Sequence, residues 1–127
     1  AKWDIDIPVY YAEINWDNLN RLAERVKIEI ADLPKFPVVR RDLSLLLDEK
    51  ITFAELAETA RRAEKKLLRD VTLFDVYEGK NLPAGKKSYA LSFYLQDTER
   101  TMSDKQIDAI MAKIRKSIED TYGATLR

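Results

Sequence analysis

One tyrosine, one aspartate and a serine stand close together in the second half of the chain, and their side chains could recognise a nucleic-acid base. Asp75 and Tyr77 share one short stretch, and Ser88 follows beyond a loop. A tyrosine ring offers a flat surface on which a base can stack, while carboxylate and hydroxyl groups can hydrogen-bond the edge of that base. Tyrosines and aspartates are also ordinary residues of exposed strands, so the residue types alone allow either interpretation.

Basic residues surround the same stretch. The candidates for contacts with phosphate are Arg40, Lys80, Lys86 and Lys87. Each could bind a nucleic-acid backbone, although most such charges only keep a surface solvated. Arg41 and Asp42 are neighbours in the sequence, and a local ion pair between them is as good an interpretation as binding.

The composition excludes several kinds of site. The 127 residues include no cysteine and no histidine, so thiolate nucleophiles, thiolate metal sites and the commonest general base are all missing. The three glycines are scattered, which rules out the glycine-rich phosphate-binding motifs. We therefore expect no catalytic residue, no metal ligand and no cofactor site in this chain.

The hydrophobic pattern of residues 36–127 predicts alternating strands and helices. The expected elements are a strand through Leu43, Leu45 and Leu47, a helix opened by the capping box of Thr52 and Glu55 and reaching Leu67, strands at 71–78 and 87–95, a helix opened by Ser103 and Gln106, and a closing strand at 124–127. Gly123 suits the left-handed end of the last helix. The order β-α-β-β-α-β predicts an α+β, ferredoxin-like split sandwich: a four-stranded antiparallel sheet with two helices on one face.

Residues 1–35 differ in character from residues 36–127. Two prolines within 33–37 favour extended backbone and indicate a linker, so we expect one domain at 36–127 and a separate segment at 1–35. The pattern predicts a strand at 9–15, a helix from 16 to 26 and another strand near Ile28 and Ile30. A segment this short cannot bury a core alone, which makes it either an appendage or the edge of a neighbouring module.

Strict alternation assigns the strand residues to faces. Between 71 and 77, Thr72, Phe74 and Val76 fall on one side, and Val71, Leu73, Asp75 and Tyr77 on the other. The apolar sides of the strands must meet the helices. The open face is then expected to carry Ser44, Asp75, Tyr77, Ser88, Ala90, Ser92 and Tyr94, with small residues beside two aromatic rings and one carboxylate.

Three ordered motifs resemble one known family. They are Phe36-Pro37-Val38-Val39-Arg40-Arg41-Asp42-Leu43, then Phe74-Asp75-Val76-Tyr77-Glu78-Gly79 followed by Leu82-Pro83-Ala84-Gly85-Lys86-Lys87-Ser88, and Asp97-Thr98-Glu99-Arg100-Thr101. Together with the closing residues 123–127 they are similar to the ferredoxin-fold anticodon-binding domain that ends the beta chain of bacterial phenylalanyl-tRNA synthetase. The resemblance covers about residues 36–127. The segment 9–14 resembles, more weakly, the last strands of the synthetase-like module before it.

The resemblance implies roles for four residues. Asp75 and Ser88 would hydrogen-bond the first anticodon base, Tyr77 would stack on it, and Ser44 would be a neighbouring contact. All four fall on the face that alternation leaves open. The implied function is to hold the anticodon stem-loop of tRNA-Phe, without chemistry in this chain.

The resemblance also implies a parent protein. That parent would be a cytoplasmic (αβ)2 ligase that uses ATP and magnesium to join phenylalanine to its tRNA, with the alpha chain as its partner. No ATP or magnesium ligand is expected in this chain. Neither a membrane nor DNA is among the partners that the resemblance implies. No run of about 18 apolar residues occurs, so no membrane span is expected, and the first residues lack a basic-then-apolar pattern, so no secretion signal is expected.

Two other functions share the β-α-β-β-α-β order. A small-ligand regulatory domain typically binds its ligand at glycine-containing loops, but the turn between Asp48 and Thr52 holds no glycine. A protein–protein module would use an apolar sheet face, whereas the expected open face is mixed. Salt separates these functions from RNA binding, which weakens steeply as salt rises.

Overall fold

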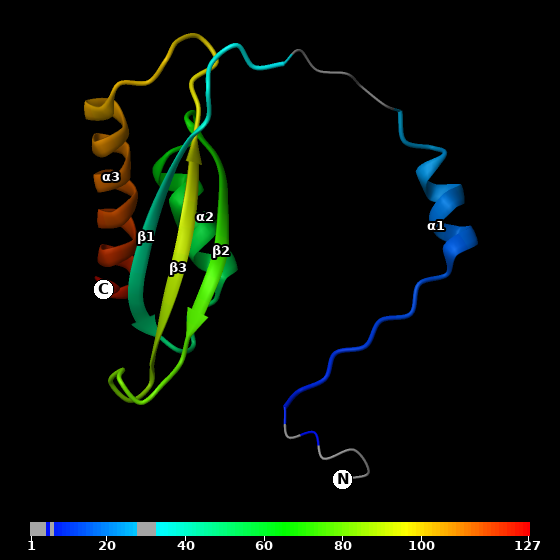
Figure 1. The fold of residues 1–127 in the computed structure, drawn as a ribbon, viewed down its shortest axis with the longest axis horizontal. Helices are drawn as coiled ribbons and strands as arrows, with labels where there is room; N and C mark the ends of the chain where they lie inside the picture. Colours follow the sequence, from blue (N-terminus) through cyan, green and yellow to red (C-terminus); the bar gives the residue numbers. More distant parts are fainter. Residues whose placement is uncertain (1–4, 6, 28–32) are drawn as a thin grey trace. The chain divides into compact units, whose positions relative to one another are not determined.

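The computed structural model of the protein describes residues 5, 7–27 and 33–127 (Figure 1). It divides into two compact units, Ala1–Leu33 and Pro34–Arg127.

The first unit contains one helix, α1 (Trp16–Ala23), which begins where the Asn15 side chain accepts a hydrogen bond from the backbone N–H of Asn18 at 2.9 Å. The predicted helix is confirmed but ends before Val26. The predicted strand at 9–15 is wrong, because those residues pair with no other strand among the described residues. The strand predicted near Ile28 and Ile30 lies outside the described residues. No side chain of α1 is buried, which agrees with a segment too short to form a core.

The second unit has the predicted order of elements. They are β1 (Val39–Asp48), α2 (Phe53–Ala63), β2 (Leu68–Tyr77), β3 (Lys86–Leu95), α3 (Asp104–Tyr122) and β4 (Thr125–Leu126). The strands form one antiparallel sheet in the order β2-β3-β1-β4. The predicted ferredoxin-like α+β fold is confirmed. Two boundaries differ from the prediction by three or more residues, since α2 ends at Ala63 before Leu67 and β2 begins at Leu68, while the predicted bounds of the later strands differ by one residue at most.

The helix ends follow from their capping residues. Thr52 accepts from the backbone N–H of Glu55 while the Glu55 carboxylate accepts from that of Thr52, so the predicted capping box is present. Ser103 caps α3 by accepting from the N–H of Gln106. At the other end Gly123 adopts φ +60°, the left-handed conformation that glycine tolerates best.

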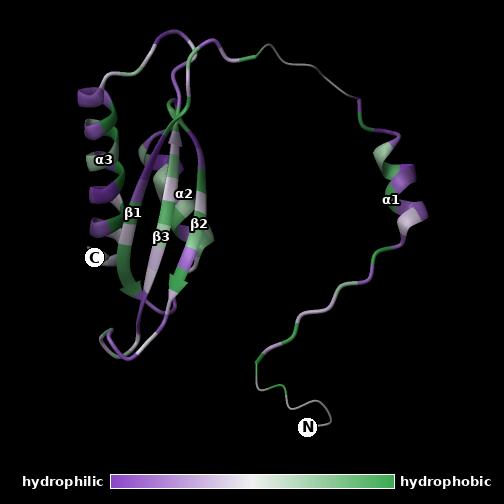
Figure 2. Ribbon diagram, in the orientation of Figure 1, coloured by the Kyte–Doolittle hydropathy of each residue, from purple (hydrophilic) through white to green (hydrophobic). Residues whose placement is uncertain are grey.

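The core lies between the sheet and the two helices. Leu45, Leu91 and Phe93 from the sheet and Leu56 and Ile114 from the helices have no exposed surface. Figure 2 shows the polar residues of α3 on its outer side. The helices also touch each other through polar groups, since the hydroxyl groups of Thr59 and Tyr122 lie 3.0 Å apart. Both helices therefore cover one face of the sheet, and its other face remains open.

Candidate nucleic-acid interface

Two neighbouring rows of paired residues bring the four predicted base contacts together on the open face. In one row Tyr77 of β2 pairs with Ser88 of β3, which pairs with Leu46 of β1. In the next row Asp75 pairs with Ala90, which pairs with Ser44. Adjacent strands lie about 4.8 Å apart, so the four predicted residues share one compact patch around Ala90. We call Ser44, Asp75, Tyr77, Ser88 and Ala90 the base patch.

An irregularity in β2 decides which side chains reach this patch. Val71 and Leu73 pair with Phe93 and Leu91 of the core, whereas Asp75 already pairs with Ala90, so Phe74 has no partner of its own. This is a β-bulge, in which two residues oppose one and the alternation of faces resets.

The bulge corrects part of the predicted face assignment. Val71 is 3% exposed and belongs to the core together with Leu73, so both face the helices and not the open side. Thr72 pairs with Ser92 of the open face. Phe74 is exposed, with an arginine guanidinium over its ring, and does not enter the core. The residues after the bulge keep their predicted sides: Asp75 and Tyr77 lie on the open face, and Val76 lies on the helix-covered face.

Two serines expected on the open face are nearly covered. The Ser88 hydroxyl lies 3.3 Å from that of Ser44, and the residue is 4% exposed. Ser92 is 1% exposed, so its hydroxyl is not accessible to a ligand. Ser88 therefore lies within the base patch, yet neighbouring side chains cover it in the free domain.

The ring of Tyr77 has neighbours on two sides. The guanidinium carbon of Arg127 lies 4.9 Å from the ring centroid, which is within the range of a cation–π contact. A Cβ atom built on Gly79 would lie 2.6 Å from the Tyr77 hydroxyl oxygen. The loop backbone at Gly79 and the last residue of the chain thus both define where the ring lies.

Besides Tyr77 and Tyr94, a further aromatic ring lies on the open face, and the strand pattern did not predict it. Phe74 is 56% exposed, and the Arg40 guanidinium lies 5.5 Å from its ring centroid. Arg40 also donates two hydrogen bonds to Asp42, at 2.9 and 3.0 Å. These bonds hold the pKa of the Asp42 carboxyl below its ordinary value. The guanidinium of Arg40 is therefore already engaged with a carboxylate.

Arg41 takes a different partner from the one the sequence suggested. Neighbouring strand residues point to opposite faces, so Arg41 and Asp42 cannot pair as a local ion pair would require. Arg41 instead lies 3.6 Å from Asp104 at the start of α3. The predicted local pair is replaced by Arg40 with Asp42, two residues apart on one face.

The three lysines of the loop region also separate. Lys87 pairs with Leu47 on the helix-covered side, is 7% exposed and holds its ammonium group 4.5 Å from the Tyr89 ring centroid. Lys86 pairs with Asp48 and alternates onto the open side, while Lys80 is exposed in the loop. Burial thus argues against a phosphate contact for Lys87.

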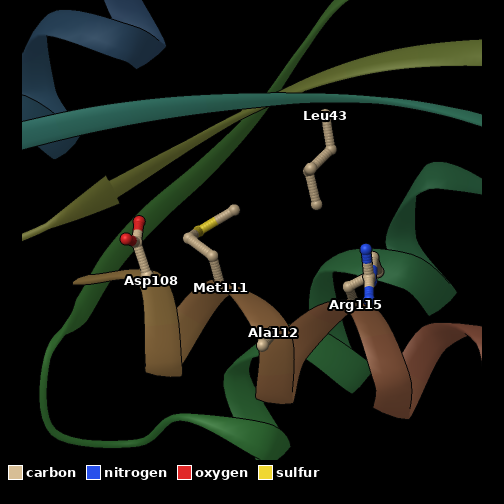
Figure 3. Close-up of a pocket in the computed structure, with 5 residues that line it drawn as sticks. All are labelled: Leu43, Asp108, Met111, Ala112 and Arg115. Carbon is tan, nitrogen blue, oxygen red and sulfur yellow. The ribbon is translucent and has the colours of Figure 1, made fainter. Parts of the chain in front are cut away.

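Among the described residues, no three acidic side chains converge as metal ligands would. A hollow of about 200 Å³ lies between β1 and α3, lined by Leu43, Asp108, Met111, Ala112 and Arg115, and Figure 3 shows four of these side chains rising from α3. It includes no residue of the base patch. Within the described ranges, no helix is long and apolar enough to cross a membrane.

Comparison with known proteins gives consistent matches. Residues 34–127 match the family described as the ferredoxin-fold anticodon binding domain. The chain is 60% identical to the phenylalanine–tRNA ligase beta subunit of Porphyromonas gingivalis over 99% of its length, and 56% identical to that of Bacteroides fragilis over 98%. It spans about 15% of the length of each of these proteins. A hydantoinase/carbamoylase family amidase from Burkholderia ambifaria aligns with 71% of this chain and 27% of its own, a weak similarity at 14% identity and a TM-score of 0.43.

Proposed function

Because this chain belongs to the family of ferredoxin-fold anticodon-binding domains, we propose that its base patch holds the first anticodon base of tRNA-Phe. The observation that carries this proposal is the pairing of two adjacent rows, which places Asp75, Tyr77, Ser44 and Ser88 around the small side chain of Ala90 on the uncovered face. A stacking ring, an acceptor and two hydroxyl groups within one patch are what a flat, polar-edged base needs.

The chemistry of Asp75 favours one kind of base edge. An ionised carboxylate only accepts hydrogen bonds, and it can accept two parallel ones at once. Guanine presents two adjacent N–H donors on its Watson–Crick edge, whereas the other bases present one donor group there. Asp75 is exposed and makes no ion pair among the described residues, so its carboxylate is free for such an edge. We therefore propose guanine as the preferred base.

Stacking and shape complete the recognition. Tyr77 supplies a ring parallel to which the base can lie, a contact worth about 1–3 kcal/mol per base. Ala90 lies between Asp75 and Ser44 in its row and leaves room for a flat ring to approach the sheet. Ser44 and Ser88 offer hydroxyl groups that can donate or accept.

Contacts with phosphate are assigned to Lys80 and Lys86. Both lie on the loop side of the patch, one exposed and one at the open start of β3. Arg40 is a weaker candidate because Asp42 occupies its guanidinium, and Lys87 is buried against Tyr89. Such backbone contacts set the register of the RNA but do not read its sequence.

We further propose that residues 1–35 are the edge and linker of a preceding module. Among the described residues of this segment, the apolar side chains are largely exposed, as Tyr10, Tyr11 and Ile14 are at 93%, 84% and 68%. Residues of this kind are expected to be covered by a part of the parent protein that this chain does not include.

The parent would be a phenylalanine–tRNA ligase, an (αβ)2 protein of the cytoplasm with a catalytic alpha chain. ATP and magnesium would then bind outside this chain. This domain would contribute by positioning the tRNA and would take no part in the chemical step.

The proposal is tested by titrating the 127-residue chain into a labelled tRNA-Phe anticodon stem-loop at about 50 and 200 mM salt. We expect binding that weakens with salt and falls roughly tenfold or more in Tyr77→Ala and Asp75→Ala. Tyr10→Ala, the same change at a fully exposed tyrosine of the first unit, serves as the matched control and should bind like the wild type. Equal affinity of the wild type and both patch variants would contradict the proposal.

A further inference from the structure

Arg127 lies over the base patch and carries a positive charge, which none of the five residues of the base patch has. Resting on the function proposed above, we propose that Arg127 is a further RNA-contacting residue. Its guanidinium covers the Tyr77 ring in the free domain, leaves the ring to an incoming base, and then pairs with the phosphate next to that base.

The backbone of Arg127 is anchored to the sheet. Thr125 and Leu126 pair with Leu46 and Leu45 of β1, and the N–H of Arg127 donates to the carbonyl oxygen of Ser44 at 3.0 Å. The register therefore continues to Arg127 opposite Ser44, in the row of Ala90 and Asp75. Because Leu126 faces the core side, the next residue faces the open side.

The side chain of Arg127 crosses the patch. Its backbone follows β4 at one edge of the sheet, yet its guanidinium carbon lies 4.9 Å from the ring of Tyr77 on β2, at the other edge. The side chain must pass above β1 and β3, the strands that carry Ser44 and Ser88. Ser88, which pairs with Tyr77 and lies 3.3 Å from the Ser44 hydroxyl, is 4% exposed, and a side chain on this path would help to cover it. A base that reaches Tyr77 and Ser88 must displace this side chain.

The charge of Arg127 is available for a phosphate. Among the described residues its guanidinium forms no ion pair, whereas the other arginine above an aromatic ring, Arg40, is held by the two hydrogen bonds that it donates to Asp42. An exposed cation–π contact is weak and is given up readily. A guanidinium pairs well with phosphate through two parallel hydrogen bonds.

Anticodon stem-loop binding to Arg127→Ala, Arg127→Lys and Arg62→Ala tests this proposal. Arg62 is an exposed arginine of α2, on the helix side of the sheet, and its loss changes the net charge by the same amount. We expect Arg127→Ala to lower the affinity about tenfold at low salt and to reduce the slope of log K against log salt by about 0.7–1. Arg127→Lys should keep the salt slope and lose part of the affinity, while Arg62→Ala should match the wild type.

The outcomes separate the two proposals. If Tyr77→Ala weakens binding while Arg127→Ala binds as tightly as the wild type, or more tightly, then Arg127 only shields the ring and this inference fails alone. If Tyr77→Ala also binds like the wild type, the proposed function fails and this inference fails with it. Circular dichroism of each variant establishes that the fold is kept.

A second measurement follows the guanidinium itself. Protons held above an aromatic ring are shifted upfield in the NMR spectrum, so the Arg127 side-chain resonances should be upfield in the free chain and should lose that shift in Tyr77→Leu. Saturating stem-loop should abolish the shift in the wild type. An unchanged shift in the RNA complex would show that the base does not take the place of Arg127 and would overturn the proposal.

Discussion

The hydroxyl end of the Tyr77 ring lies against the backbone of Gly79, so closely that a Cβ atom at Gly79 would come within 2.6 Å of the phenolic oxygen and 2.7 Å of the carbon that bears it. Gly79 does not have a positive φ, unlike Gly85 and Gly123. Glycine is needed at this position because a side chain there would collide with the Tyr77 ring. The backbone conformation of Gly79 is not the reason for the glycine. The stacking platform and the loop thus share one close contact.

Gly79→Ala should move the platform without unfolding the domain. The added methyl group meets the free end of a side chain, which can swing away, so we expect a small change in the melting temperature. The displaced ring should lower the affinity for the stem-loop about tenfold, since stacking is worth about 1–3 kcal/mol. Asn81→Ala, in the same exposed loop, is the control. Wild-type affinity in Gly79→Ala would show that the ring position is not critical.

Asp75→Asn should change which base is preferred. The amide replaces one acceptor oxygen by a donor, so it can no longer accept two hydrogen bonds from guanine. We expect the preference for guanine over adenine at the first anticodon position to fall by about 1–3 kcal/mol, the discrimination of a good bidentate pair. Stem-loops that differ only at that base measure it, with Asp108→Asn on α3 as control. A preference that survives in Asp75→Asn would remove this residue from base recognition.

Lys86→Met and Lys87→Met should affect RNA binding differently although the two residues are neighbours. Lys86 lies on the open side, and its loss should weaken RNA binding and reduce the salt slope by about one unit. Lys87 is 7% exposed on the helix-covered side, and its replacement by an apolar side chain of similar length should leave RNA binding unchanged. Fluorescence anisotropy at several salt concentrations compares the two. Equal losses in both variants would show a general charge effect.

Asp97→Asn should alter the dependence of stability on pH. The N–H of Glu99, and less so Arg100, lower the pKa of the Asp97 carboxyl below its usual 3.8. A lowered pKa in the folded state stabilises above the unfolded pKa, and this contribution is lost as pH falls through the folded value. The wild type should therefore lose more unfolding free energy than Asp97→Asn between about pH 6 and pH 3 in urea titrations. If the wild type and Asp97→Asn lose the same amount of unfolding free energy over this range, Asp97 does not contribute to the dependence of stability on pH.

The elements of this protein could be predicted from local sequence signals. Thr52 with Glu55, Ser103 and Gly123 are read from a few neighbouring residues, and the hydrophobic spacing between them predicts the helices and strands. The order of these elements then narrows the possible folds to the ferredoxin-like one, because few topologies pack two helices on one antiparallel sheet. The motif around Asp75 and Tyr77 predicts a candidate site through its resemblance to a known family, since the residue types alone allow either interpretation.

The features that only the tertiary structure decided are those that depend on contacts between different strands. Alternation counts residues along one strand, whereas the bulge at Phe74 exists because two residues of β2 oppose one of β3. That pairing sends Val71 into the core and still turns Asp75 and Tyr77 outward. The placement of Arg127 over Tyr77 likewise joins residues that are distant in the sequence and lie on opposite edges of the sheet. Local periodicity carries no information about such contacts, since they arise only when the sheet has assembled.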